Sequence, residues 1–98
     1  MVKVEHEPQK KRFAVHLPEG EGELVYVERS PQVLELVHTG VQPSLKGLGV
    51  GDALVQTAVA YAREKGMHIV PTCSYVRHWL KSHPEAQDLV ARDPAAKS

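Results

Sequence analysis

The sequence predicts a mixed α+β (α/β) fold in which an antiparallel meander of three strands precedes a helix, a parallel strand and a second helix. Two observations lead to this prediction. Before Pro43, two segments have the two-residue period of a strand and a third is rich in β-branched residues, whereas after Pro43 apolar residues recur every three or four positions, as in a helix. The chain has 98 residues, 42% of them hydrophobic and 24% charged, which is ordinary for one globular domain. We therefore expect a single domain over residues 1–98, with an ordered core over about 12–90 and a flexible tail over 91–98.

The three strands of the meander are expected at 12–17, 23–28 and 33–41. In the first of them Phe13, Val15 and Leu17 share one side, and the third is rich in β-branched residues. Segments 18–22 and 29–32 contain the glycine, proline and serine residues typical of turns. Both connections are short, which favours antiparallel pairing of consecutive strands.

A helix of about sixteen residues is expected next, because Val50, Leu54, Ala58 and Ala62 form an apolar stripe. Gly66 can take the left-handed conformation that ends a helix. Residues 67–73 then read as a short buried strand, which a helical crossover makes parallel to the third strand. A second helix is expected at about 75–82, and Pro84 ends or restarts it.

Composition excludes several classes of function. Lys+Arg and Asp+Glu balance at 12 each, so the clustered positive charge that binds nucleic acid is missing. The longest apolar run, Ala58 to Ala62, is far shorter than a membrane span. The single cysteine, Cys73, cannot form an internal disulfide, which favours a reducing, cytoplasmic location. The histidines show no metal-ligand spacing, so no metal site is expected.

The most informative segment is Lys46–Gly51, in which three glycines alternate just before the long helix. Glycines let a ligand approach the backbone closely, and a helix N-terminus offers unpaired N–H groups to an anion. This pattern indicates a phosphate or pyrophosphate cradle. The alternative is a glycine-rich turn that merely starts a helix. The segment does not match a P-loop, and a dinucleotide-binding fingerprint beginning at Gly47 would end on Asp52, where a carboxylate would repel pyrophosphate.

The segment resembles instead the signature [QR]-x-x-G-x-[GA] of the GNAT superfamily of acyl-CoA-dependent N-acyltransferases, with Lys46, Gly49 and Gly51 at its three defining positions. Together with segments 38–41, 70–73 and 83–85, it is similar to the short single-domain, YjdJ-type branch of that superfamily. The resemblance covers about Phe13 to Val90. It implies a minimal GNAT-like fold and an acetyl-CoA-dependent N-acetyltransferase.

For the co-substrate, the resemblance implies that acetyl-CoA lies in a wedge between the strands at 34–41 and 68–73. The pyrophosphate would bind the amides of residues 48–51, the pantetheine arm would pair with backbone near Thr39 and Val41, and Lys46 would add a positive charge. Lys46 replaces the usual Gln or Arg, so a bidentate phosphate contact is not available from it. The expected binding residues for acetyl-CoA or coenzyme A are Thr39, Val41, Lys46, Gly47, Leu48, Gly49, Val50, Gly51 and Cys73.

For the chemistry, the resemblance implies direct attack of a neutral amine on the thioester. Trp79 stands where the family commonly has the Tyr that protonates the departing thiolate, and indole is too weak an acid for that role. Tyr75 and Ser74, on the same segment, are the candidate substitutes. His38 is a candidate base, or a histidine bonded to a neighbouring strand or loop. Cys73 is a candidate nucleophile, or a small side chain that lines the acetyl pocket.

Full-size GNAT domains have helices between their first strands, and they have a further pair of strands after the last helix. This sequence has neither of these two parts. We therefore expect an open acceptor site that admits an unidentified amine, either a protein lysine or a small amine. Two alternatives remain: a non-catalytic acyl-CoA-binding module, and a small interaction domain whose glycines only cap a helix.

Overall fold

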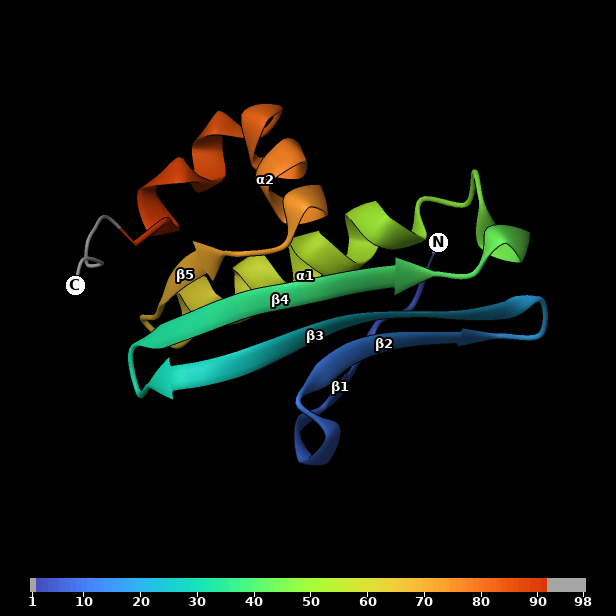
Figure 1. Ribbon diagram of the computed structural model, residues 1–98, viewed down its shortest axis with the longest axis horizontal. Coiled ribbons are helices and arrows are strands. Elements are labelled where there is room, and N and C mark those ends of the chain that lie inside the picture. The colour runs from blue at the N-terminus through green and yellow to red at the C-terminus, as the bar shows by residue number, and fades with distance from the viewer. Residues whose placement is uncertain (1, 92–98) are drawn as a thin grey trace.

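The structure, a computed structural model, describes residues 2–91 and contains one five-stranded sheet in the order β1-β2-β3-β4-β5 (Figure 1). Pairing is antiparallel from β1 to β4, and β5 is parallel to β4. The expected order of meander, helix, parallel strand and helix is confirmed. The elements are β1 (Glu5–Glu7), β2 (Arg12–Leu17), β3 (Gly20–Ser30), β4 (Val33–Val41), α1 (Val50–Glu64), β5 (His68–Pro71) and α2 (Ser74–Lys81), with short 3-10 turns at Pro8–Lys10, Pro43–Leu45 and Pro84–Leu89.

One face of the sheet carries the core, and α1 packs against it (Figure 1). The helices α1 and α2 also contact each other. Side chains of directly paired residues lie on the same face of a sheet, so the register assigns the row Phe13, Leu24 and Thr39 to the α1 side. The largest fully buried side chains are Tyr26, Phe13, Leu24, Leu34, Leu36, Leu45, Leu54, Ile69, Val15, Val50, Val55 and Val76. No helix among residues 2–91 is long and apolar enough to cross a membrane.

The first hairpin is tighter than the sequence predicts. Leu17 pairs with Gly20, so the turn consists of two residues, and 20–22, expected as turn, belong to β3. Gly22 serves packing instead, because a Cβ there would lie 2.8 Å from Val50 Cγ1. The start of α1 therefore approaches β3 directly over this glycine.

The strand β1 is a feature that the sequence analysis missed. Glu5–Glu7 is short and polar, with no apolar alternation. Its His6 ring stacks on Phe13 with centroids 4.5 Å apart, and His6 Nε2 lies 2.6 Å from the Tyr26 hydroxyl. Contacts with residues far along the chain, rather than local propensity, thus hold this strand at the edge of the sheet.

β4 changes its neighbours halfway along its length. It pairs with β5 only from Val33 to Leu36, and the next residue, Val37, is an extra residue in the register with β3, a β-bulge that bends the strand. Beyond the bulge, residues 37–41 have no strand beside them on the β5 edge in the described part of the chain. The strands therefore part near the turn that leads into α2 (Figure 1).

Candidate acyl-CoA site at the start of the long helix

The glycine segment lies between β4 and α1 and is open on its outer side. Gly47 and Gly49 have φ of +87° and +74°, and no heavy atom lies within 4 Å of a Cβ built on either. The first backbone hydrogen bond of α1 runs from Ala53 N to Gly49 O. The amides of Val50, Gly51 and Asp52 therefore have no acceptor within the helix and can bind an anion.

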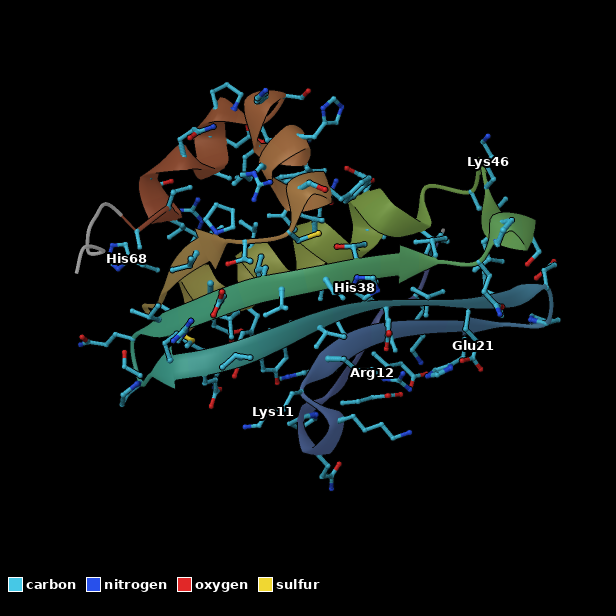
Figure 2. All side chains as sticks on the ribbon, viewed as in Figure 1. Lys11, Arg12, Glu21, His38, Lys46 and His68 are labelled. Atoms are coloured by element: carbon cyan, nitrogen blue, oxygen red, sulfur yellow. The ribbon has the colours of Figure 1, made fainter. Side chains whose placement is uncertain are left out.

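The amide of Leu48 does not join this group. It donates to Leu45 O at 3.1 Å, so of the amides of residues 48–51 that the sequence analysis expected to bind pyrophosphate, the first already has an acceptor within the protein. The bond closes a further turn over residues 45–48, directly after the 3-10 turn that Leu45 N–Gln42 O and Lys46 N–Pro43 O close. The Leu48 side chain is half exposed, and Lys46 extends from the loop into solvent (Figure 2).

A cavity of about 270 Å³ lies over the free amides. It connects the glycine segment with the end of β4 and with the first turn of α2. Most of the residues expected to bind the co-substrate line it; Thr39, Leu48 and Cys73 do not. The lining residues are Val41, Leu45, Lys46, Gly47, Gly49, Val50, Gly51, Asp52 and Tyr75.

The first hairpin holds the segment in place. Ser44 Oγ donates to Glu19 O at 2.6 Å, and the Glu21 amide donates to Gln42 Oε1 at 2.7 Å. The sequence analysis did not identify Gln42 and Ser44, because nothing local indicates that the 18–19 turn lies against them. The first hairpin of the meander thus holds in place the segment that leads into the glycines.

Tyr75 covers part of the first turn of α1. A Cβ on Gly51 would lie 2.6 Å from the Tyr75 hydroxyl, so the two helices meet closely only because residue 51 has no side chain. Burial, and secondarily the charge of Asp52, raises the pKa of Tyr75. Its hydroxyl therefore stays protonated at neutral pH and can donate a hydrogen bond.

Asp52 belongs to the same turn, but its carboxylate is engaged elsewhere. Oδ1 accepts from Trp79 Nε1 at 2.6 Å, and Oδ2 accepts from Gln56 Nε2 at 3.0 Å. Trp79 is buried at the junction of α1 and α2. The structure thus assigns the Trp79 indole a polar contact with Asp52 that the sequence analysis did not foresee.

Cys73 lies where β4 and β5 part. Its amide donates to Leu36 O at 2.9 Å, and its Sγ lies 3.3 Å from Thr39 Oγ1. Burial alone would raise the pKa of this thiol, but the hydrogen bond with Thr39 and the nearby amides of Val76 and Tyr75 outweigh burial and lower it. These amides influence Sγ without well-aligned capping bonds.

His38 lies on the other face of the sheet. It pairs with Val25, which pairs with Arg12 on the face opposite α1 (Figure 2). A Cβ on Gly40 would lie 3.1 Å from His38 Nε2, so the imidazole leans over Gly40. Gly40 lines a cavity of about 370 Å³ on this open face, and Val41 lines both this cavity and the one over the amides. The end of β4 therefore separates two cavities, one on each face.

Three potential metal ligands meet on the outer strands, among the described residues: Glu5, Glu7 and His16. Glu7 accepts from Arg12 and lies 2.7 Å from His16 Nε2. The hydrogen bonds with His16, then Arg12, lower the pKa of Glu7 to about 2. Since both oxygens of Glu7 are already in use, the cluster is explained as an ion-pair network.

Comparison with known proteins gives consistent results along the chain. A family model described as GCN5-related N-acetyl-transferase matches residues 12–89. The mouse protein NATD1 is 27% identical over 95 residues, which cover 95% of this chain and 86% of that protein. The human NATD1 protein is 26% identical, over 95% of this chain and 84% of its own length.

Solved structures resemble the fold as well. A GCN5-like protein from Staphylococcus aureus, determined by NMR in solution, superimposes with a TM-score of 0.72 at 26% identity, over 96% of this chain and 92% of that chain. Ard1 from Thermoplasma volcanium has a TM-score of 0.59 at 20% identity, over 76% of this chain and 55% of its own, and is similar in fold alone.

Proposed function

Because this chain belongs to the GCN5-related N-acetyltransferase family, we propose that it transfers an acetyl group from acetyl-CoA to an amine. One observation carries the proposal. The free amides at the start of α1 open into a cavity that reaches the end of β4, so a single ligand with an anionic end and an extended amide-bearing arm fits both. Coenzyme A has these two parts.

Different residues bind the different parts of coenzyme A. The pyrophosphate binds the amides of Val50 and Gly51, beside the open glycines Gly47 and Gly49. Lys46 contributes positive charge from the rim. The arm pairs with the free edge of β4 between Thr39 and Val41, and its thioester end lies near Cys73, at the parting of the strands.

The amine approaches from the open face of the sheet, where the cavity beside Gly40 lies. Its nitrogen attacks the thioester carbonyl, so that a C–N bond forms and the C–S bond breaks. His38, on this face, accepts the proton that the amine loses. Tyr75, on the other face, is the candidate donor to the departing thiolate. The acceptor is a small amine or a protein lysine.

A non-catalytic acyl-CoA-binding module is the second candidate. It is favoured by the separation of the two candidate proton-transfer groups, since the side chains of His38 and Tyr75 lie on opposite faces and neither side chain is hydrogen-bonded to Cys73 among the described residues. In this case the cavity over the amides would still bind coenzyme A.

Two measurements test these candidates. Calorimetry with coenzyme A measures binding, and release of free thiol from acetyl-CoA with a panel of small amines and lysine-bearing peptides measures transfer. Binding with amine-dependent thiol release is the expected result. Binding without transfer to any amine would favour the non-catalytic module, and absence of binding would contradict both candidates.

A further inference from the structure

Asp52 raises a question about the proposed site. It is the third residue of α1 and lines the same cavity as the free amides. An acidic side chain at this position of a helix can reach back to the N-terminal amides. A carboxylate that did so would occupy the donors that an anionic ligand needs and would repel its charge.

The contacts of Asp52 show why this does not happen. One carboxylate oxygen accepts from Trp79 Nε1 at 2.6 Å and the other from Gln56 Nε2 at 3.0 Å. Gln56 lies one turn further along α1, and Trp79 belongs to α2. Both bonds therefore draw the carboxylate away from the glycine segment, and no hydrogen bond joins it to an amide of residues 49–52 among those described.

Trp79 is itself held firmly. Its side chain is 7% exposed, and its ring stacks on His83 with centroids 3.6 Å apart and planes 5° from parallel. The His83 Nδ1 lies 2.8 Å from Trp79 O and ties the imidazole to the end of α2. A buried, stacked indole offers its N–H in one direction only, so it is a rigid donor to Asp52.

We propose that Trp79 is a positioning residue that holds the Asp52 carboxylate away from the amides at the start of α1 and so keeps these amides available to the anionic end of coenzyme A. This inference rests on the proposed function. It assigns Trp79 no part in proton transfer. It also weakens the objection that Asp52 would repel pyrophosphate, since two hydrogen bonds hold the carboxylate turned away from the amides and solvate its charge.

The test is a double-mutant cycle read by calorimetry with coenzyme A. Trp79→Phe keeps a stacked ring and removes the N–H, so the released carboxylate should compete with the ligand and raise Kd about tenfold, about 1.4 kcal/mol. Asp52→Asn alone removes a negative charge from the cavity lining and should not raise Kd. Asp52→Asn in the Trp79→Phe background should restore Kd to within about twofold of the parent.

A gentler variant covers the case in which Trp79→Phe does not fold. Gln56 is exposed, so Gln56→Leu should fold, remove the second donor and raise Kd by a smaller factor, again restored by Asp52→Asn. Two results would overturn the inference: an unchanged Kd in the variants that lack a donor, or a loss that Asp52→Asn does not restore, which would mean that Trp79 and Gln56 act on packing alone. A parent protein that binds no coenzyme A would refute the proposed function, and the inference with it.

Discussion

The phenol of Tyr75 fills the space that a side chain at Gly51 would need, with its hydroxyl 2.6 Å from a Cβ built there. Gly51 has helical rather than left-handed backbone, because its φ is not positive. The glycine is therefore required by a neighbour and not by its own conformation. The two helices that border the proposed site meet at this pair.

The Gly51–Tyr75 contact predicts that the effect of Gly51→Ala on the free energy of unfolding depends on whether the Tyr75 ring is present. Gly51→Ala should not stabilise the parent, because the new methyl group meets the Tyr75 ring. With Tyr75→Ala present, the same change should stabilise by about 0.5–1 kcal/mol, since alanine favours a helix over glycine. Urea unfolding of the four proteins measures both effects. Equal effects of Gly51→Ala in the two backgrounds would contradict the contact.

Gly49 is expected to matter for binding as well as for folding. Gly49→Val strains a left-handed residue and places a branched side chain beside the amides, so Kd for coenzyme A should rise at least tenfold, about 1.4 kcal/mol. Gly66→Val is the matched control, because Gly66 has a φ of +68° and equally open surroundings beyond the other end of α1. It should destabilise similarly and leave Kd unchanged. If both variants weaken binding alike, the glycine segment is not the cradle.

Thr39 is predicted to set the reactivity of Cys73. Its hydrogen bond opposes the effect of burial and lowers the pKa of the thiol. Thr39→Val should raise that pKa and slow alkylation by iodoacetamide at pH 7.5, measured by intact mass. Thr57→Val is the control, since the Thr57 hydroxyl bonds to Ala53 O within α1. If the alkylation rate changed in Thr57→Val but stayed the same in Thr39→Val, the assignment would be contradicted.

Cys73 itself is predicted to line the acetyl pocket. Cys73→Ala should lower transfer modestly and leave coenzyme A binding near normal, because direct attack needs no enzyme nucleophile. Saturating coenzyme A should protect the parent thiol from alkylation. An acetyl adduct that forms and decays at the catalytic rate, and is absent from Cys73→Ala, would instead establish covalent catalysis. Unhindered alkylation would place Cys73 outside the site.

His6 and His16 are expected to change the free energy of unfolding with pH in opposite directions. Burial lowers the pKa of His6, so its contribution is present above its ordinary pKa of about 6.5 and is lost as the pH falls below that value. Hydrogen bonds with Glu7 and Glu21 raise the pKa of His16, so its contribution is present below about 6.5 and is lost as the pH rises through the raised pKa.

Urea unfolding between pH 5 and 8 separates the two histidines. His6→Gln should abolish the loss of stability on the acid side, and His16→Gln should abolish the loss on the alkaline side. An acid-side loss that persists in His6→Gln would show that another group titrates there.

Much of the fold could be predicted from the sequence because its signals are local. The stripe from Val50 to Ala62 and the left-handed Gly66 determined α1, and alternation determined the strands of the meander. The limits of β3 were missed because Gly20 and Gly22 are typical of turns, whereas in the fold Gly22 makes room for Val50. β1 was missed because it is short and polar, and its His6 packs on Phe13, Tyr26 and Tyr61, contacts that its own residues do not indicate.

For the site, the sequence by itself determined the glycine segment and its place before α1, since glycine spacing and a helix start are properties of consecutive residues. Only the tertiary structure decided which amides remain free, that His38 and Cys73 lie on opposite sides of β4, and that Trp79 and Gln56 turn Asp52 aside. Each of these depends on a bulge, a strand register or a contact between segments distant in the chain. Such relationships are set by packing many residues at once, and no local pattern encodes them.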